Sequence, residues 1–363
     1  MNICFLAGGN SIHSYRWITY FADKRNEISW VSLSPLSEGS TIPEIDFYEI
    51  RSFSKKIFSI LKAVFKVRQL IKETRPEILH AHYAGTYGLI GALSGFHPFI
   101  LTPWGSDILM AGKSEIKKWF VKYILKRTDL ITCDAEHMRN AIIKFGVDSE
   151  KIHIIYFGID TQKFFPGRRS EDLAKKLEVF DSPVIVSLRS LEPVYDIETL
   201  IRSVPHVVKE IPDAKFIIVG TGSQEKTLKR LSKALGVSQR IRFVGKIPNE
   251  DISQYLGIAD IYVSTSLSDA GIAASTAEAM ACGLPVVITD SGENRKWVKD
   301  GEGGFLIPVR NDSSLAEKII YLLHNKELRI KFGKTNRRVI EQKNNYYKEM
   351  EKMDKIYKLM KRK

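Results

Sequence analysis

The chain has 363 residues, 44% of them hydrophobic, which is more than one core usually holds; this predicts two globular domains and excludes a disordered chain. Its formal net charge is +13, yet no nucleic-acid recognition motif accompanies that charge, so we expect no nucleic-acid partner. Cys4, Cys133 and Cys282 are odd in number and far apart in apolar sequence, which argues against a disulfide framework or zinc cluster and favours reduced core thiols.

The N-terminal sequence MNICFLAGGN holds a short apolar segment that stops at a glycine pair and carries no basic leader. We therefore expect neither a signal peptide nor a membrane anchor there. The longest mostly apolar segment, residues 89–103, is interrupted by His97 and Pro98 and is too short to cross a bilayer. A cytoplasmic protein without membrane-spanning segments is the expectation.

Short β-branched segments alternate with helical periods throughout the first half of the chain. This alternation predicts a parallel, doubly wound sheet, as in a Rossmann-like domain. The strands are expected at residues 2–7, 28–33, 77–82, 99–102, 130–133 and 152–156.

A Gly- and Pro-containing segment, FGIDTQKFFPGRRSED, then indicates a domain boundary, which we place between residues 167 and 168. A second Rossmann-like domain is expected over 168–340. Residues 325–363 are expected to form a polar helical tail, whose C-terminal helix, at about 340–363, could pack back on the first domain. The strands of the second domain are expected at residues 184–188, 215–219, 242–245, 261–265, 286–289 and 305–308.

Two basic helices are expected in the first domain, at residues 51–75 and 113–127. Both interleave lysine and arginine with aromatic and aliphatic residues. They could lie on an anionic membrane surface, or each could combine a solvated face with a core stripe, and the sequence leaves both interpretations open.

Glycine-rich turns follow the first strand of each domain or its neighbour. Gly8 and Gly9 could let a ligand approach the backbone, or could form a tight turn without a ligand. The turn at 219–223 favours a nucleotide contact at Gly222. Because neither a complete GxGxxG with its acidic partner nor a GxxxxGK[ST] occurs, dehydrogenase and P-loop functions are disfavoured.

The segment 266–290 joins a loop of small residues, a short helix and a buried strand. Its backbone N–H groups could hold a diphosphate near Ser275 and Thr276, while Glu278 accepts hydrogen bonds from hydroxyls. Ser275 to Glu278 also fits the Ser-x-x-Glu capping box of an ordinary helix. A nucleotide-sugar would offer both a diphosphate and hydroxyls.

Arg189 follows a predicted strand at its carboxyl end, where its planar fork could pair with two phosphate oxygens. The alternative is a surface arginine paired with Glu192. No Asp-x-Asp and no metal-ligand spacing occurs, so we expect no metal or other cofactor. Arg189, Lys246 and the helix terminus at Ser275 would then share the diphosphate charge.

Three segments in the expected order carry a family resemblance: 155–166 (IYFGIDTQKFFP), 243–266 (FVGKIPNEDISQYLGIADIYVSTS) and 278–292 (EAMACGLPVVITDSG). Gly8-Gly9, HAH at 80–82 and TPWGSD at 102–107 also match. The chain resembles family 4 of the retaining glycosyltransferases over nearly its whole length.

The resemblance implies the GT-B fold, an α/β architecture of two Rossmann-like doubly wound parallel-sheet domains that face each other across a cleft. It implies metal-independent transfer of a sugar from a nucleotide-diphosphate donor, with retained configuration. The donor would lie in the C-terminal domain and the acceptor against the N-terminal domain. Arg189 matches the phosphate-binding arginine and Glu278 the ribose-binding glutamate, while 245–247 (with Lys246 and Ile247) match the base site and 273–276 the diphosphate and sugar site.

The chain departs from the family pattern on the donor side. Ala270 stands where an acidic residue eight positions before Glu278 is usual, and the nearest carboxylate, Asp269, is shifted by one residue. A lysine that usually follows the arginine is absent, since Val194 and Tyr195 occupy that region. Loss of one cation should weaken stabilisation of the leaving group unless another donor replaces it.

A third departure concerns the acceptor side, where Trp104 replaces the usual histidine of a His-Gly-x-Asp motif. An indole cannot act as a base, so Trp104 would either stack on a sugar or belong to the core. Asp107 or His82 could orient the acceptor hydroxyl, and His13 is a further candidate for contact with the acceptor.

These features together predict a cytoplasmic, peripherally membrane-associated glycosyltransferase that closes two domains over a nucleotide-sugar and transfers to a glycan or lipid-linked acceptor in cell-surface polysaccharide or glycolipid synthesis. Two other functions remain open. One is a nucleotide-sugar epimerase or hydrolase on the same fold. The other is a non-catalytic partner that binds a nucleotide-sugar.

Overall fold

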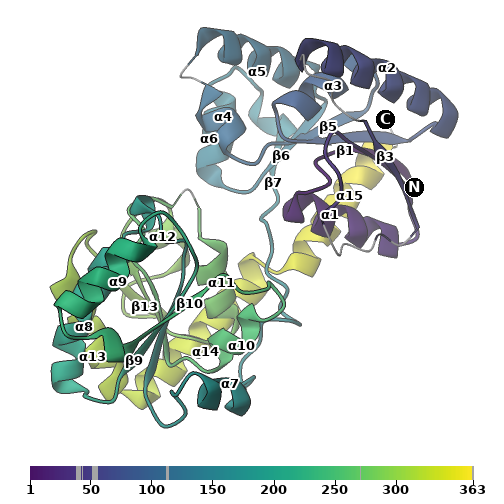
Figure 1. The fold of residues 1–363 in the computed structure, drawn as a ribbon. Helices are drawn as coiled ribbons and strands as arrows, with labels where there is room; N and C mark the ends of the chain where they lie inside the picture. Colours follow the sequence, from purple (N-terminus) through teal and green to yellow (C-terminus); the bar gives the residue numbers. More distant parts are fainter. Residues whose placement is uncertain (38–41, 43, 51–55, 112–113, 270, 362–363) are drawn as a thin grey trace. The chain divides into compact units, whose positions relative to one another are not determined.

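The computed structural model describes residues 1–37, 42, 44–50, 56–111, 114–269 and 271–361. The chain divides into two compact units, each with its own parallel sheet (Figure 1). The first unit consists of Met1–Phe157 together with Tyr347–Lys363, and the second consists of Gly158–Tyr346.

The sheet of the first unit has seven parallel strands in the order β3-β2-β1-β4-β5-β6-β7. The order reverses direction at β1 and β4, as expected of a doubly wound sheet, and this places the carboxyl ends of both strands beside the switch point. The strands are β1 (Asn2–Leu6), β2 (Glu27–Ser32), β3 (Ile45–Glu49), β4 (Ile78–His82), β5 (Phe99–Thr102), β6 (Leu130–Cys133) and β7 (Ile152–Ile154).

Alternate residues of these strands face opposite layers of helices. Cys4 and Leu6 join the core that includes side chains of α2, α3 and α5, whereas Phe5 and His80 face Trp17 of α1 and Tyr357 of α15. The helices are α1 (Ile12–Asp23), α2 (Lys56–Thr74), α3 (Thr86–Ser94), α4 (Ser106–Leu109), α5 (Glu115–Arg127), α6 (Glu136–Ile143) and α15 (Tyr346–Lys361).

The sheet of the second unit has six parallel strands in the order β10-β9-β8-β11-β12-β13, with its switch point between β8 and β11. The apolar, β-branched runs of the four inner strands are buried on both faces, which is the pattern that a parallel sheet requires, while the two edge strands are partly buried. The strands are β8 (Val184–Leu188), β9 (Lys215–Val219), β10 (Ile241–Gly245), β11 (Ile261–Ser264), β12 (Val286–Thr289) and β13 (Gly304–Ile307).

The two faces of this sheet again receive different helices. Ile261 and Val263 of β11 face the core that α8, α9 and α13 complete, whereas Tyr262 points to the other face and reaches α11. The helices are α7 (Glu171–Lys176), α8 (Ile197–Glu210), α9 (Glu225–Ala234), α10 (Ile252–Gly257), α11 (Ala274–Ala281), α12 (Asn294–Trp297), α13 (Asp312–His324) and α14 (Lys326–Lys343).

Every strand expected from the sequence is present, and the fold class is confirmed, but β3 was not predicted. Of the two basic helices, α2 begins at Lys56 and α5 at Glu115; the proposed starts at 51–55 and at Lys113 lie outside the described residues. The helical tail forms two helices. Tyr357 of α15 packs on the first sheet through its hydroxyl, which hydrogen-bonds Nδ1 of His80 at 2.5 Å.

The chain crosses between units ten residues earlier than the sequence indicated, at Phe157 and Gly158, and it returns at Tyr346 and Tyr347. Residues 158–167 belong to the second unit because they bond to its helices and loops. The N–H of Ile159 donates to the carbonyl of Asn344 at 2.7 Å, and the N–H of Tyr346 donates to the carbonyl of Ile159 at 3.0 Å. The guanidinium of Arg337 also donates to the carbonyls of Thr161 and Phe164.

The three cysteines are free and buried, as expected of core thiols. Burial raises the pKa of each thiol, to about 12, so each stays protonated at neutral pH. Among the helices that the structure describes, none is both long and apolar enough to span a bilayer.

Candidate functional site

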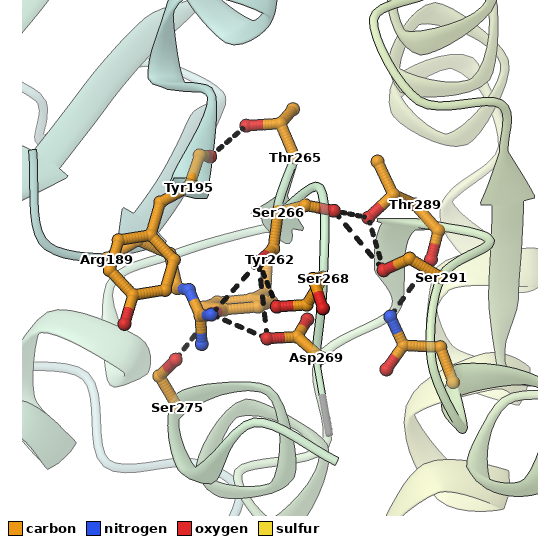
Figure 2. Close-up of polar contacts among 11 residues, drawn as sticks. Arg189, Tyr195, Tyr262, Thr265, Ser266, Ser268, Asp269, Ser275, Thr289 and Ser291 are labelled. Atoms are coloured by element: carbon orange, nitrogen blue, oxygen red, sulfur yellow. Dashed lines mark hydrogen bonds and ion pairs between the residues drawn. The ribbon is translucent and has the colours of Figure 1, made fainter. Parts of the chain in front are cut away.

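An ion pair lies at the carboxyl edge of the second sheet, where open parallel sheets bind ligands. Arg189 directly follows β8, and Asp269 lies in the loop after β11, so the switch point brings the two together. Nη2 of Arg189 donates to Oδ1 of Asp269 at 2.6 Å (Figure 2). Their side chains are only 10% and 7% exposed, respectively, so the carboxylate neutralises the guanidinium with little solvent screening.

Two further side chains surround this pair. Nη2 of Arg189 also lies 3.3 Å from Oγ of Ser266, which in turn donates to Oδ1 of Asp269 at 3.2 Å. The guanidinium carbon lies 4.3 Å from the centre of the Tyr195 ring, a cation–π contact that Figure 2 shows. Tyr195 stands in the region where the family pattern has a lysine, so an aromatic face supports the arginine from there.

The loop that carries Asp269 is fixed to the end of β12. Oγ1 of Thr289 donates to the carbonyl of Ser266 at 2.5 Å, and Oγ of Ser291 donates to the same carbonyl at 3.2 Å. Gly292 has φ +55°, and a Cβ there would lie 1.5 Å from the carbonyl oxygen of Asp269. The close approach therefore requires glycine at this position.

The helix α11 does not begin with the capping box that the sequence suggested. Its N-cap is Ala273, with no side-chain hydrogen bond, and Ser275 lies in the first turn. The Oγ of Ser275 is 2.8 Å from the hydroxyl of Tyr262, so this serine joins the helix to β11 instead of capping it. Thr276 is buried, and Glu278 lies half-buried two residues further along α11.

The turn at Gly222 packs against the segment after Arg189. A Cβ on Gly222 would lie 2.4 Å from the carbonyl oxygen of Leu191, so this glycine is needed for contact between two turns. Glu192 accepts from the N–H of Ser223 at 2.8 Å, and its partner is therefore Ser223 and not Arg189. The surface pair of Arg189 with Glu192 was a wrong interpretation.

The remaining donor candidates lie at the end of β10. Lys246 is exposed and Ile247 is half-buried, directly after the strand. Ala270, which the family comparison singled out, lies outside the described residues. The second unit thus brings Arg189 and Asp269 into contact; Lys246 lies at the carboxyl end of β10, and α11 follows the loop after β11 that carries Asp269.

In the first unit, His82 ends β4 on the face covered by α1. Its Nδ1 hydrogen-bonds Oγ of Ser14 at 3.0 Å, while its buried Nε2 has no hydrogen-bond partner among the described residues. Burial, together with the nearby His13, lowers the pKa of His82 to about 3, so the ring is neutral at physiological pH. A neutral imidazole nitrogen can exchange a hydrogen bond with a hydroxyl.

Aromatic rings gather around this histidine. The ring centre of Trp104 lies 5.3 Å from that of His82 and 5.3 Å from that of His13, and Trp17 packs edge-on against both His82 and Trp104. His13 also meets Phe157 edge-on at 4.4 Å. These contacts join the acceptor candidates His13, His82 and Trp104 in one aromatic cluster. Trp104 is only half-buried, so the cluster has an edge that solvent can reach.

Asp107 has a structural part that the sequence did not reveal. Its carboxylate accepts the N–H groups of Ala84 at 2.6 Å, Gly105 at 2.9 Å and Trp104 at 3.1 Å. The side chain is buried, and these bonds use its oxygens to hold the turn that carries Trp104. The proposal that Asp107 orients an acceptor hydroxyl is corrected: it is a positioning residue for Trp104.

The glycine pair after β1 is likewise engaged within the protein. The N–H of Gly9 donates to Oγ of Ser32 at 2.8 Å, and a Cβ on Gly9 would lie 2.7 Å from the carbonyl oxygen of Pro35. Gly9 therefore allows two loops to approach each other, and its N–H is not free for a phosphate. Gly8 has more room, since the nearest atom to its Cβ position is Oδ1 of Asn10 at 3.2 Å.

Acid should destabilise the first unit through its buried histidines. The unfolded chain binds a proton at His82 below about pH 6.5, whereas the folded chain does not until about pH 3, so stability falls as the pH falls through this window. We expect the free energy of unfolding to drop by about 2 kcal/mol per such histidine between pH 7 and 5. Urea unfolding of His82→Gln should show a smaller drop, and the exposed His324→Gln should behave as wild type; equal drops in all three proteins would contradict this origin.

The sequence singled out neither Ser266 nor Tyr262 as a site residue, whereas Tyr195 was noted as standing in the region of the missing lysine. Ser266 lies just after β11 and Tyr262 within it, so the position near one strand is their only sequence signal. Within the described ranges, no group of three or more His, Cys, Asp or Glu residues is arranged to hold a metal ion.

Comparison with known proteins identifies the family to which this two-unit chain belongs. The model of "Glycosyl transferases group 1" matches residues 168–339, and that of "Glycosyl transferase 4-like" matches residues 2–135. The chain belongs to this GT4-type family of glycosyltransferases.

Individual relatives are distant but extend over most of the chain. N-acetyl-alpha-D-glucosaminyl L-malate synthase of Bacillus anthracis is 22% identical over 96% of this chain and 93% of its own. An Escherichia coli UDP-Gal:alpha-D-GlcNAc-diphosphoundecaprenol alpha-1,3-galactosyltransferase is 26% identical over 82% of this chain and 79% of its own. The solved structure of Anabaena HepE in complex with UDP superimposes with TM-score 0.81 at 20% identity, over 98% of this chain and 99% of that one. The fold is GT-B.

Proposed function

We propose that the protein is a retaining, metal-independent hexosyltransferase that moves a sugar from a nucleotide-diphosphate donor to a glycan or lipid-linked acceptor in the synthesis of a cell-surface polysaccharide or glycolipid. The observation that carries the donor assignment is the position of Arg189 at the switch point of the second sheet, beside a loop fixed by Gly292. Relatives that use UDP-galactose or bind UDP support a nucleotide-sugar.

The donor would be bound by the second unit. Arg189 would pair with phosphate oxygens and stabilise the departing diphosphate, with Lys246 and the first turn of α11 supplying further positive potential. Glu278 would accept hydrogen bonds from ribose hydroxyls, and the end of β10 would receive the base. Because protein cations would carry the diphosphate charge, transfer should persist in a chelator.

The acceptor would be bound by the first unit, at the aromatic cluster of His13, Trp104 and His82. Half-buried Trp104 offers a ring on which a sugar can stack, and Nε2 of His82 lacks a hydrogen-bond partner within the described structure. As a neutral imidazole, His82 would orient the acceptor hydroxyl while the second unit holds the reacting sugar.

Glu278→Gln should mainly weaken donor binding, because an amide replaces one acceptor oxygen with a donor group. We expect the dissociation constant of the donor to rise roughly tenfold, as for a lost hydrogen bond to a charged group. A thermal-shift screen with UDP-, GDP-, CMP- and dTDP-sugars identifies the donor first, since a ligand of the native state raises its melting temperature. Titration calorimetry then compares wild type, Glu278→Gln and the exposed Glu327→Gln; unchanged donor binding and activity in Glu278→Gln would overturn the assignment.

The same donors test the other functions that the sequence left open. An epimerase or hydrolase would isomerise or release the sugar without an acceptor. A non-catalytic partner would bind a donor and transfer to no acceptor in a screen of glycans and lipid-linked sugars. The proposed transferase requires product formation only when donor and acceptor are both present.

We further propose that the protein is cytoplasmic and binds anionic membranes through α2 and α5, which both contact α3. Exposed apolar side chains on these helices alternate with lysines: Leu61 and Phe65 on α2, and Ile116, Trp119 and Phe120 on α5. Phe65, Ile116 and Trp119 are 74%, 72% and 63% exposed, so their packing within the unit does not account for them. Apolar and cationic groups together suit the interface of an anionic lipid surface.

Lys117→Glu/Lys118→Glu should therefore reduce sedimentation with phosphatidylglycerol vesicles. Each lysine near an anionic surface contributes about 1 kcal/mol to binding. The double charge reversal should therefore lower the partition coefficient by roughly tenfold or more. Lys326→Glu, on α14, is the matched control and should bind as wild type. Equal binding of wild type to phosphatidylcholine vesicles, or no release by salt, would contradict an electrostatic attachment.

A further inference from the structure

The pair of Arg189 and Asp269 is incompletely hydrogen-bonded although it is buried. The contact uses one nitrogen of the guanidinium, Nη2, and one oxygen of the carboxylate, Oδ1. Within the described residues, Nε of Arg189 has no acceptor and Oδ2 of Asp269 has no donor, and both atoms are shut off from solvent. An ion pair with a purely structural role would satisfy these atoms, because unpaired buried polar groups are costly.

The two partners are held differently. The backbone of Asp269 is fixed by close contact with Gly292, and the hydroxyl of Ser266 holds its carboxylate. Arg189 is a long side chain that lies on the ring of Tyr195 and is anchored at its tip by Asp269 and Ser266. A rearrangement of the pair would therefore move the guanidinium and leave Asp269 in place.

We infer that Asp269 competes with the diphosphate of the donor for the guanidinium of Arg189, an inference that rests on the proposed function. Without donor, the carboxylate neutralises the arginine. A diphosphate presents several charged oxygens, which can pair with Nε and Nη2 as a fork and give Nε the acceptor that it lacks. Asp269 is then a specificity-determining residue. It lowers the affinity of Arg189 for every phosphate ligand, so that only an anion with several charged oxygens displaces the carboxylate, and weakly charged anions do not bind.

The test compares Asp269→Asn with wild type by titration calorimetry against UDP, GDP, CDP and dTDP, and against the four nucleosides without phosphate. Asparagine can still accept from Ser266 but no longer competes as an anion. We expect the variant to bind the same nucleoside diphosphate roughly ten- to hundredfold more tightly, the range for one charge-assisted hydrogen bond, with nucleoside binding unchanged. Asp290→Asn is the matched control: it removes an equal charge at the end of β12, where Asp290 pairs with exposed Arg295, and should leave affinity within about twofold.

Equal or weaker diphosphate binding by Asp269→Asn would overturn the inference while leaving the proposed function standing. If wild type bound none of the four diphosphates, the proposed function would fail as well. Circular dichroism and thermal unfolding check that the variant folds, and Asp269→Ser serves as a second variant. A crystal structure of wild type with its nucleoside diphosphate needs no variant: the distance from Nη2 of Arg189 to Oδ1 of Asp269 should exceed hydrogen-bond range, and an unchanged pair would contradict competition.

Discussion

Replacement of Arg189 by methionine should destabilise the second unit by about 3 kcal/mol or more and lower kcat/KM for transfer by roughly a hundredfold or more. Methionine can still lie on Tyr195, but Asp269 would be left buried without its cation, since its side chain is 7% exposed. The loss of activity has a separate cause, namely the loss of the charge that stabilises the departing diphosphate. Urea unfolding measures the first effect and steady-state kinetics the second.

The double variant Arg189→Met/Asp269→Asn separates the two effects. Removing both charges should restore most of the stability, because no buried charge is left unpaired, while activity stays low. Arg295→Met is the matched control: Arg295 is 73% exposed in its pair with Asp290, so we expect its urea unfolding to be close to that of wild type. Recovery of activity in the double variant would show that Arg189 acts only on folding.

Gly292→Ala should be the most damaging change of a single small residue near the site. The added Cβ would lie 1.5 Å from the carbonyl oxygen of Asp269, at φ +55°, and a backbone atom cannot turn aside as a flexible side chain can. The loop from Ser266 to Asp269 must then shift. We expect a loss of about 2–3 kcal/mol beyond the cost of left-handed backbone alone, measured by urea unfolding.

Gly301→Ala provides that backbone reference. Gly301 has φ +77° and nothing within 4 Å of its Cβ position, so alanine there should cost only about 1 kcal/mol from backbone strain. If the two alanine variants lost the same stability, the close approach between Gly292 and Asp269 would not be a rigid constraint.

The sequence predicted most of the sheet framework because apolar, β-branched segments between turn residues are a local signal. It missed β3, whose sequence IDFYE places two acidic residues in an edge strand with no fully buried position. An edge strand of a parallel sheet with such a composition has little of the apolar run that identifies its neighbours. The boundary near residue 167 was placed on composition, whereas backbone bonds of Ile159 to the Asn344 region decide it.

The site residues show the same division between local and distant information. The position of Arg189 after a strand was readable, but its partner Asp269 is eighty residues away, and the nearby Glu192 looked equally suitable. From the sequence, Asp107 was a candidate for orienting the acceptor hydroxyl. Its hydrogen bonds to the backbone of Ala84 and Gly105 form only in the folded turn, so the sequence could not reveal them. Ser275 matched a capping box, yet the helix begins at Ala274 and the hydroxyl turns to Tyr262.

The backbone bonds between Ile159 and the segment of Asn344 and Tyr346 link the folding of the two units. The second unit is an insertion in the chain of the first, and these bonds bring its two ends together. While the second unit is folded, α15 has a short connection to the first unit. It packs on the first sheet there, where the hydroxyl of Tyr357 hydrogen-bonds His80. If the second unit unfolds, α15 is connected to the rest of the first unit by a coil of about 190 residues. Bringing the ends of that coil together costs roughly 4–5 kcal/mol of chain entropy. Unfolding of the second unit should therefore weaken the first, because α15 would lose its short connection to the first sheet.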